Sequence, residues 1–420
     1  MREMKDSGVQ WIGEIPIEWA IDNPKYHFTQ RKDRAKQGMV QLTASQKYGV
    51  ITQTEYMEKT GANIVTVQKD FDILKLVCAG DFVIHMRSFQ GGLEYSEKTG
   101  SISSAYVMLI PHNTIREPRY YKWFFKSSNY IDALSSTSNL VRDGQAMRWA
   151  NFIQLPIPFP PADEQQRIAD FLDAKCAEID ALTADIQAQI DTLEQYKRSI
   201  ITETVTKGLN PDAEMKDSGI QWIGDMPAHW GVIRGKYILR YMQKPVREND
   251  GVITCFRDGE VTLRSNRRED GFTMSDKEIG YQGIDVDDLV IHGMDGFAGA
   301  IGISDSRGKA SPVLNVLDTD QCKRYIMYYL RSMAYSDVFL ALATGIRVRS
   351  CDLRWNKLAE LSYPVPPLDE QNAIVKHIDS VLSKADAVIA DKKAQLATLD
   401  EYKKSLIFEY VTGKKEVPVS

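Results

Sequence analysis

The apolar residues of this chain recur with two different periods, and the longest segments follow the helical one. Between Asp163 and Lys207 there is no proline or glycine, and apolar residues recur at spacings near three and four, as in an amphipathic helix. A second such segment follows Pro366 and Pro367, so we expect two helices of about 45 residues, each about 65 Å long. Apolar residues seven apart indicate coiled-coil seams. We expect the seams to contain Ile168, Leu172, Ile179, Ile186, Leu193 and Ile200 in the first helix, and Ile374, Ile378, Val388, Leu399 and Leu406 in the second.

Outside these helices, short β-branched runs alternate with helical patterns. Runs bounded by glycine, proline or aspartate predict strands at 80–86, 103–111, 287–294 and 310–318. Aromatic and aliphatic residues three and four apart predict helices over 120–136 and 324–344. The expected fold class is therefore α/β (α+β), with two globular blocks joined by two long antiparallel helices.

A short phrase occurs twice in the chain. MKDSGVQWIGEIPIEW (Met4–Trp19) and MKDSGIQWIGDMPAHW (Met215–Trp230) agree at 11 of 16 positions. The starts and ends of the long helices also match each other, at an offset of 206, whereas residues 20–145 and 231–350 share little identity. A duplicated unit of block plus helix explains this pattern. It divides the chain into a block at 1–160, a helix at 161–210, a block at 211–366, and a helix with the C-terminal tail at 367–420.

The duplication also predicts how the two ends of the chain meet. Residues 410–420 match residues 204–214, which lead into the second copy of the phrase. If the helices run antiparallel, the end of the chain lies beside the first copy and closes a pseudo-twofold circular arrangement. The phrase would then be a joint that fastens each block to a helix end, with Trp11, Trp19, Trp222 and Trp230 packed there.

Composition restricts the class of protein. The chain has 420 residues, of which 43% are hydrophobic and 26% charged, as in soluble proteins of more than one domain. Five scattered cysteines without a CxxC pair fit a reducing compartment. We find no signal peptide and no membrane span, and we expect a cytoplasmic protein. The net charge of −5 is unevenly distributed, because residues 156–210 carry 10 acidic and 5 basic side chains. A basic face elsewhere remains compatible with the composition.

No catalytic constellation stands out. There is no G-x-x-x-x-G-K-[ST] phosphate loop, no Asn/Asp-Pro-Pro-aromatic tetrad of an adenine methyltransferase, and no ligand spacing among the six histidines. We interpret GFAGAIG (Gly296–Gly302) as a tight loop and PDAEMK (Pro211–Lys216) as a linker. His85 and His292 follow FVI and LVI at matching places, which indicates a role at a strand end. We expect no metal and no cofactor to be bound by this chain.

Both blocks carry arginine, lysine, asparagine and glutamine beside glycine, and these side chains bind phosphates and read base edges in DNA. For any single loop, the simpler interpretation is a solvated surface. The concentration of such loops in two unlike blocks favours DNA binding. The candidates are Lys32, Arg34, Lys36, Arg142 and Gln145 in the first block, and Arg257, Arg264, Asn266, Arg267, Arg268, Arg307, Lys309, Arg347 and Arg349 in the second.

Three shared motifs together resemble those of one family over essentially the whole chain. They are the KDSG-x-QWIG-x-x-P-x-x-W openings at 5–19 and 216–230, the PPxxEQxxI helix starts at 160–168 and 366–374, and the YK(R/K)S sequences at Tyr196 and Tyr402. The family is the specificity subunit of type I restriction–modification systems. The resemblance implies two target-recognition domains that each read one half of a bipartite double-stranded DNA target, with helices that fix the gap.

The resemblance also implies that catalysis lies on other, prokaryotic subunits. Two modification subunits, docked on the helices, would use S-adenosylmethionine to methylate adenine. Restriction subunits would use ATP and Mg to translocate and cleave DNA. MRSFQGG (86–92) resembles the DNA-facing loop of the family, so Arg87, Ser88 and Gln90 would contact DNA. The second block has HGMDGFAG (292–299) there, so its contacts are expected chiefly from the arginines and Asn266 named above.

Two other classes of function remain open. A coiled-coil adaptor with two peptide-binding heads predicts no salt-dependent affinity for DNA. A fused enzyme with an unrecognised site predicts turnover by the purified chain alone.

Overall fold

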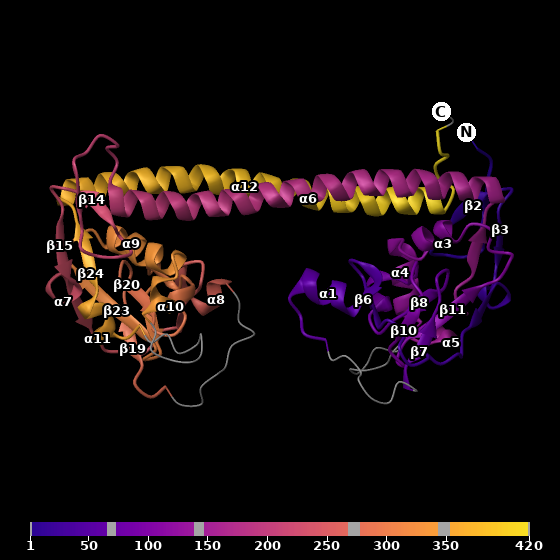
Figure 1. The fold of residues 1–420 in the computed structure, drawn as a ribbon, viewed down its shortest axis with the longest axis horizontal. Coiled ribbons are helices and arrows are strands. Elements are labelled where there is room, and N and C mark those ends of the chain that lie inside the picture. The colour runs from indigo at the N-terminus through magenta and orange to yellow at the C-terminus, as the bar shows by residue number, and fades with distance from the viewer. Residues whose placement is uncertain (1, 65–72, 138–146, 268–277, 343–352, 419–420) are drawn as a thin grey trace. The chain divides into compact units, whose positions relative to one another are not determined.

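The computed structural model describes residues 2–64, 73–137, 147–267, 278–342 and 353–418 (Figure 1). The chain forms two compact units: unit 1 is Met1–Ile186 with Ala394–Ser420, and unit 2 is Gln187–Lys393. The boundaries between the units lie inside the two long helices. The sequence suggested four consecutive parts, namely block, helix, block and helix. The structure divides the chain differently, because each long helix packs with its first half against one block and with its second half against the other.

Unit 1 is built on a four-stranded antiparallel sheet in the order β4-β11-β8-β9. Two-stranded sheets surround it: β1-β2, β3-β12, β5-β6 and β7-β10. The elements are β1 (Met4–Asp6), β2 (Glu14–Pro16), β3 (Ala20–Asp22), η1 (Pro24–Tyr26), β4 (Phe28–Gln30), β5 (Leu42–Ser45), β6 (Gly49–Thr52), α1 (Gln53–Thr60), β7 (Lys75–Val77), β8 (Phe82–Ile84), α2 (Ser88–Gly91), β9 (Glu94–Tyr95), β10 (Gly100–Ile102), β11 (Val107–Pro111), α3 (Pro118–Phe124), α4 (Ser128–Ser136), α5 (Trp149–Phe152) and β12 (Ile157–Phe159).

Unit 2 repeats this plan with the sheet order β16-β23-β20-β21. Its smaller sheets are β13-β14, β15-β24, β17-β18 and β19-β22. The elements are β13 (Met215–Asp217), β14 (Asp225–Pro227), β15 (Gly231–Arg234), α7 (Gly235–Ile238), β16 (Leu239–Met242), β17 (Ile253–Cys255), β18 (Val261–Leu263), α8 (Arg264–Arg267), β19 (Gln282–Ile284), β20 (Leu289–His292), η3 (Gly296–Ala298), β21 (Ile301–Ile303), β22 (Gly308–Ala310), β23 (Leu314–Thr319), α9 (Lys323–Tyr335), α10 (Val338–Ala341), α11 (Trp355–Glu360) and β24 (Ser362–Val365).

Each central sheet is covered on both faces, which explains why its strands are continuous apolar runs. In unit 2, Leu289 and Ile291 pack into the cluster that contains α9, whereas Val290 faces the cluster of the β17-β18 hairpin. In unit 1, Phe82 and Val83 divide in the same way. The predicted strands correspond to β8, β11, β20 and β23.

The two shorter predicted helices are each broken. The predicted helix at 120–136 is interrupted between α3 and α4, where the Ser127 hydroxyl donates to the Phe124 carbonyl (2.7 Å). The one at 324–344 breaks between α9 and α10, where Asp337 adopts a left-handed φ of 55°. The expectation of continuous helices was therefore wrong, because apolar period alone does not detect a local change of backbone direction.

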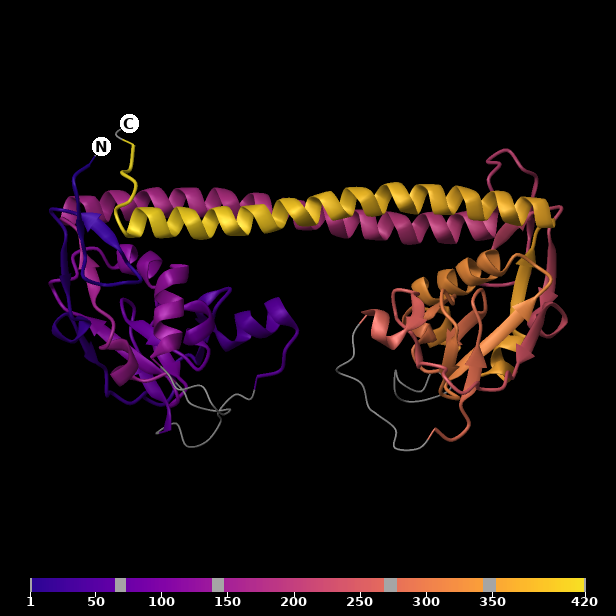
Figure 2. The same cartoon turned by 180° about the vertical axis from the view of Figure 1, so that it is seen from behind.

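The two long helices are α6 (Ala162–Lys207) and α12 (Leu368–Val411), which lie side by side in both views (Figures 1 and 2). In unit 1, the Lys403 ammonium donates to Asp180 (2.6 Å), and the rings of Phe171 and Tyr410 lie 4.4 Å apart. The residue numbers on α12 decrease as those of their contacts on α6 increase, so the two helices run antiparallel in this unit. In unit 2, Lys197 with Asp386 and Gln189 with Lys392 give the same direction.

Most of the predicted seam residues are buried, but Val388 is not. Val388 is 45% exposed, whereas the neighbouring Ile389 is 4% exposed. Likewise Ile201 is buried, and the predicted Ile200 is only partly so. A straight helix of 3.6 residues per turn drifts from a strict seven-residue repeat by about 20° per heptad, so the buried face advances by one residue. Leu193 and Leu399 are partly buried, and the remaining seam residues are buried: Ile168, Leu172, Ile179, Ile186, Ile374, Ile378 and Leu406.

The repeated phrase packs against a helix start in both units. The Trp19 indole N–H donates to Glu164 of α6 (2.9 Å), and the Trp230 indole N–H donates to Glu370 of α12 (3.1 Å). Trp19 and Trp230 are fully buried, and Trp11 and Trp222 are partly buried against the same cores. The phrase therefore forms a joint, as its position in the repeat predicts.

The two joints differ in whether the chain runs through them. In unit 2, Gly208 ends α6 with a φ of 75° and lies against Trp230, which follows in the same stretch of chain. In unit 1, the matching residue is Gly413 (φ 69°), which follows α12 and lies against Pro16 and Trp19. The Lys414 ammonium donates to the Ile12 and Glu14 carbonyls (2.9 and 3.1 Å). Noncovalent contacts in unit 1 thus replace the covalent continuity of unit 2.

Candidate nucleic-acid interface

A pair of equivalent loops follows strand β8 in unit 1 and strand β20 in unit 2. We call residues 85–92 and 292–299 the histidine loops, because each begins with a histidine and the two align at a constant offset of 207. Each continues into a short helical turn, α2 or η3, and ends at a glycine with positive φ, Gly92 (74°) or Gly299 (96°). A Cβ at Gly92 would lie 1.9 Å from the Phe125 carbonyl oxygen, so only glycine fits there.

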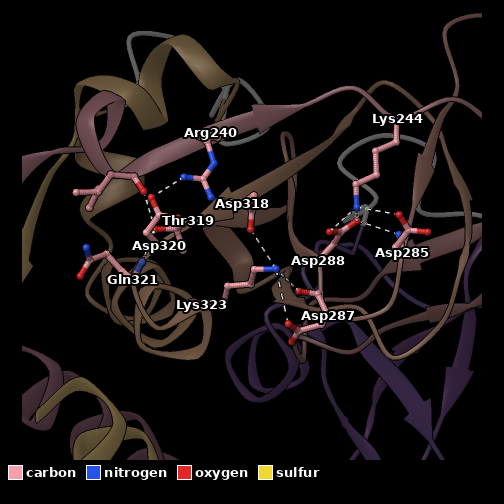
Figure 3. Close-up of polar contacts among 11 residues, drawn as sticks. Arg240, Lys244, Asp285, Asp287, Asp288, Asp318, Thr319, Asp320, Gln321 and Lys323 are labelled. Atoms are coloured by element: carbon pink, nitrogen blue, oxygen red, sulfur yellow. Dashed lines mark hydrogen bonds and ion pairs between the residues drawn. The ribbon is translucent and has the colours of Figure 1, made fainter. Parts of the chain in front are cut away.

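The strand that leads into each loop is anchored by a buried carboxylate. Asp81 binds Arg31 (2.7 Å), and Asp288 binds Lys244 (2.7 Å). In Figure 3, Lys244 reaches both Asp285 and Asp288. Burial lowers the pKa of Lys244, but its hydrogen bonds to these carboxylates outweigh burial and raise the pKa overall. A buried carboxylate paired in this way holds the start of the strand in one position.

A second group of ion pairs supports the neighbouring strand β23. Figure 3 shows Arg240 beside Asp320, and Lys323 beside Asp287 and Asp318. The hydrogen bond from Arg240 lowers the pKa of Asp318 to about 2. These carboxylates neutralise Arg240 and Lys323 locally.

The tip of a β-hairpin contacts each histidine loop. In unit 1, the Gln46 side-chain amide donates to the Arg87 carbonyl (2.9 Å). In unit 2, the Arg257 guanidinium binds Asp295 (2.8 Å). The hairpins β5-β6 and β17-β18 hold equivalent places, so each unit presents one composite surface of loop and hairpin.

In unit 2 this surface contains a groove of about 540 Å³, within the range of ligand-binding clefts. Arg267 is held in it by Asp258 (2.7 Å) and Glu260 (3.0 Å) and lies 4.1 Å from the centre of the Phe256 ring. A guanidinium fixed in this way presents its remaining N–H donors in a defined direction, as base reading requires. Other residues that line the groove are Thr254, Arg257, Arg264, His292 and Asp295.

The candidate DNA-binding side chains of unit 1 form fewer salt bridges than those of unit 2. Lys32, Lys36 and Arg87 are exposed, and none forms a salt bridge with another described residue. Arg34 is exposed and donates to the Ile73 carbonyl (3.1 Å). Gln90 is exposed at the end of the histidine loop.

Ser88 does not fit the role expected of it. Its side chain is 0% exposed, and its hydroxyl accepts a hydrogen bond from the His85 backbone N–H (2.9 Å). The hydroxyl closes the loop internally, so a direct contact with DNA is not available to it in this structure.

The remaining candidates of unit 2 are mostly engaged within the unit. The Asn266 amide donates to Thr262 (2.9 Å), Arg307 binds Asp250 (3.2 Å), and Lys309 binds Glu278 (2.7 Å). Five candidates lie outside the described residues: Arg142, Gln145, Arg268, Arg347 and Arg349.

Sequence reasoning found Arg257 at the hairpin tip of unit 2 but missed the hairpin tip of unit 1, and it gave the histidines only a general role. Gln46 had no motif to mark it, whereas the matched places of His85 and His292 were visible in the sequence. The structure adds no metal centre, since no group of three or more metal-binding side chains occurs among the described residues. In the same parts of the chain, no helix has the length and apolarity needed to cross a membrane.

Comparison with known proteins finds similarity to one family. A family model for the type I restriction modification DNA specificity domain matches residues 24–192. The chain is 23% identical over 439 residues to the putative type I restriction enzyme MjaX specificity subunit of Methanocaldococcus jannaschii, with 97% of this chain and 96% of that protein covered. It is 21% identical over 354 residues to the StySPI specificity subunit of Salmonella potsdam, with 82% and 74% covered.

The fold has a relative of known structure. A chain from a study of complex assembly and conformational transition of the type I R-M system aligns with a TM-score of 0.65 and 13% identity, covering 96% of this chain and 99% of that one. The two-unit fold is therefore shared over the full length. The family model and these relatives bear out the resemblance to type I restriction–modification specificity subunits, and the solved structure shows a shared fold.

Proposed function

We propose that this chain is the non-catalytic, DNA-reading subunit of a type I restriction–modification complex, and that each unit reads one half of a bipartite target. One observation carries the proposal: in both units a histidine loop is in contact with a hairpin tip, but the side chains differ. Arg87 and Gln46 stand in unit 1 where Met294 and Arg257 stand in unit 2. Equal scaffolds with unlike contacts are what reading two different half-sites requires.

The helix pair is proposed to dock two modification subunits. Unit 1 exposes Leu182 and Tyr402 (47% and 55%), and unit 2 exposes Val388 and Tyr196 (45% and 48%). These residues correspond through the repeat, and in the antiparallel register the members of each pair lie at the same level. Exposed tyrosines on otherwise polar helices are typical of interface anchors. Two equal anchor sites fit two copies of one partner.

The docking proposal is tested with a double substitution. Tyr196→Ser with Tyr402→Ser should prevent the modification subunits from co-purifying with the full chain, and should leave its thermal unfolding unchanged because both rings are exposed. Tyr237→Ser is the control, since Tyr237 is more exposed than either and lies on α7. Retention of the partners by the double variant would contradict the proposal.

The cofactors and the location follow from this assignment. We assign S-adenosylmethionine to the modification subunits, and ATP with Mg to the restriction subunits, with none on this chain. We place the complex in a prokaryotic cytoplasm, where it meets chromosomal DNA. The proposed closed arrangement of the chain rests on the two equivalent joints, one covalent and one not.

The proposed function is tested by base-resolved mapping of methylated adenine in cells that produce this chain with and without its modification subunits. We expect a bipartite motif only when both are present. A continuous motif would contradict the two-unit reading. Methylation by the chain alone would favour a fused enzyme, and absence of any DNA affinity would favour an adaptor with peptide-binding heads.

A further inference from the structure

The backbone of each histidine loop is bonded to one nitrogen of its histidine. In unit 2, Nδ1 of His292 accepts the backbone N–H groups of Met294 (3.3 Å) and Asp295 (3.0 Å). In unit 1, Nδ1 of His85 accepts the N–H of Arg87 (3.3 Å). Arg87 and Asp295 are the residues that the hairpin tips contact. The histidine therefore lies beneath the part of the loop that faces the hairpin.

This bonding requires one protonation state. A backbone N–H can donate only to an unprotonated Nδ1, so the proton of the neutral ring must be on Nε2. In unit 1, Nε2 lies 3.6 Å from the buried carboxylate of Glu94, which Lys126 also binds. In unit 2, Nε2 lies 3.8 Å from Asp295. Neither carboxylate lies within hydrogen-bond distance of Nε2, so the contacts at Nδ1 alone indicate the tautomer.

We infer that His85 and His292 are positioning residues for target reading, each holding its loop in the binding conformation through an unprotonated Nδ1 and each acting on one half-site. The inference rests on the proposed function and deepens it. Protonation of Nδ1 would set an N–H against the donors of the loop, so the loop would have to open. DNA reading should therefore weaken on acidification.

The groups around His292 set the pH at which its ring becomes protonated. Burial and the charge of Arg257 lower its pKa, while Asp295 opposes them, and the pKa is lowered overall. Arg264, Arg267 and Asp258 line the same groove. Because its pKa is lowered, His292 stays neutral at pH values where an ordinary histidine is already partly protonated. Loop order is therefore complete near neutral pH and is lost as the pH falls through the lowered pKa.

Substitutions that keep or remove the acceptor test the inference. Asparagine places an oxygen near the position of Nδ1 and does not titrate in this range, whereas leucine fills the space without an acceptor. The readout is the affinity of the full chain with its modification subunits for duplexes that carry the mapped motif, or the motif with one half scrambled. It is measured from about pH 5.5 to 8.

For His292→Leu we expect about tenfold weaker binding through the second half-site, with discrimination at the first half-site unchanged. His292→Asn should bind within about twofold of the unaltered chain at pH 8 and show a flatter pH dependence. His85→Leu should weaken binding through the first half-site in the same way, and His85→Asn should preserve that binding at pH 8. His377→Leu, an exposed substitution on α12, controls for loss of a histidine elsewhere.

Several outcomes would overturn the inference: equal behaviour of the leucine and asparagine variants, loss of both half-sites together in a folded variant, or an unchanged pH profile in His292→Asn. If a leucine variant fails to fold, the pH profile of the asparagine variant decides. If the unaltered complex reads no bipartite motif, the proposed function itself fails, which the mapping experiment reveals separately.

Discussion

Arg267 is held by two carboxylates and an aromatic ring, whereas Lys36 forms no salt bridge with another described residue. The two side chains therefore suit different tasks. A fixed guanidinium can discriminate between base edges, because its donors have one orientation. A mobile, exposed ammonium binds phosphates of any sequence, and each such contact contributes to the salt dependence of binding.

Lys32→Ala with Lys36→Ala should weaken DNA binding about fivefold on cognate and unrelated duplexes alike. The slope of log affinity against log salt should fall by about one for each lysine removed. A salt titration of binding by the full chain measures both effects. Arg240→Ala serves as the control, since two carboxylates already neutralise Arg240. A change in the mapped motif would contradict the phosphate role of the lysines.

At the scale of elements, the two long helices depend on each other. Their ion pairs link Asp180 to Lys403 in unit 1 and Lys197 to Asp386 in unit 2. A deletion in one helix alone would shift the register on one side of the deletion, and so would break pairs there. A change in length must therefore be made in both helices at facing positions.

Removing residues 186–189 together with the facing residues 393–396 should shorten the gap between half-sites by about two base pairs, since four helical residues span about 6 Å. The half-sites themselves should be unchanged, because the loops and hairpins that face DNA are retained. Mapping of methylated adenine reads both quantities. Altered half-sites with an unchanged gap would show that the helices do not set the spacing.

At the scale of the whole molecule, the joint of unit 1 is formed by the two ends of the chain, whereas the chain runs continuously through the joint of unit 2. Tyr120 donates to the Val411 carbonyl at the end of α12 (2.7 Å), and Tyr325 donates to the Val205 carbonyl near the end of α6 (3.1 Å). The same packing thus forms with and without a covalent link. The energy of the joint resides in its contacts, and connectivity contributes only the entropy of closing a loop.

A permuted chain, opened between Pro211 and Asp212 and joined by a short linker from Ser420 to Met1, should fold and retain the same target. The opening lies in an exposed turn, and the new ends would match the existing arrangement in unit 1. Thermal unfolding and the mapped motif are the measurements. A permuted chain that folds but reads a different target would contradict the equivalence of the two joints.

The sequence by itself determined the features that depend on local pattern. It predicted the duplication, the two long helices, the four buried strands and the tryptophan joint, since apolar period, proline and glycine act on neighbouring residues. The candidate cations were also visible, but only as a composition. The presence of an arginine or lysine in the sequence does not indicate which carboxylate will lie beside it in the fold.

Only the tertiary structure decided what each side chain faces. It buried Ser88, exposed Val388, separated paired from unpaired cations, and placed a histidine beneath each loop. These outcomes depend on residues far apart in the chain, such as Gln46 with Arg87 or Arg257 with Asp295. Packing brings such partners together through the whole sheet and helix arrangement, so no local period records them.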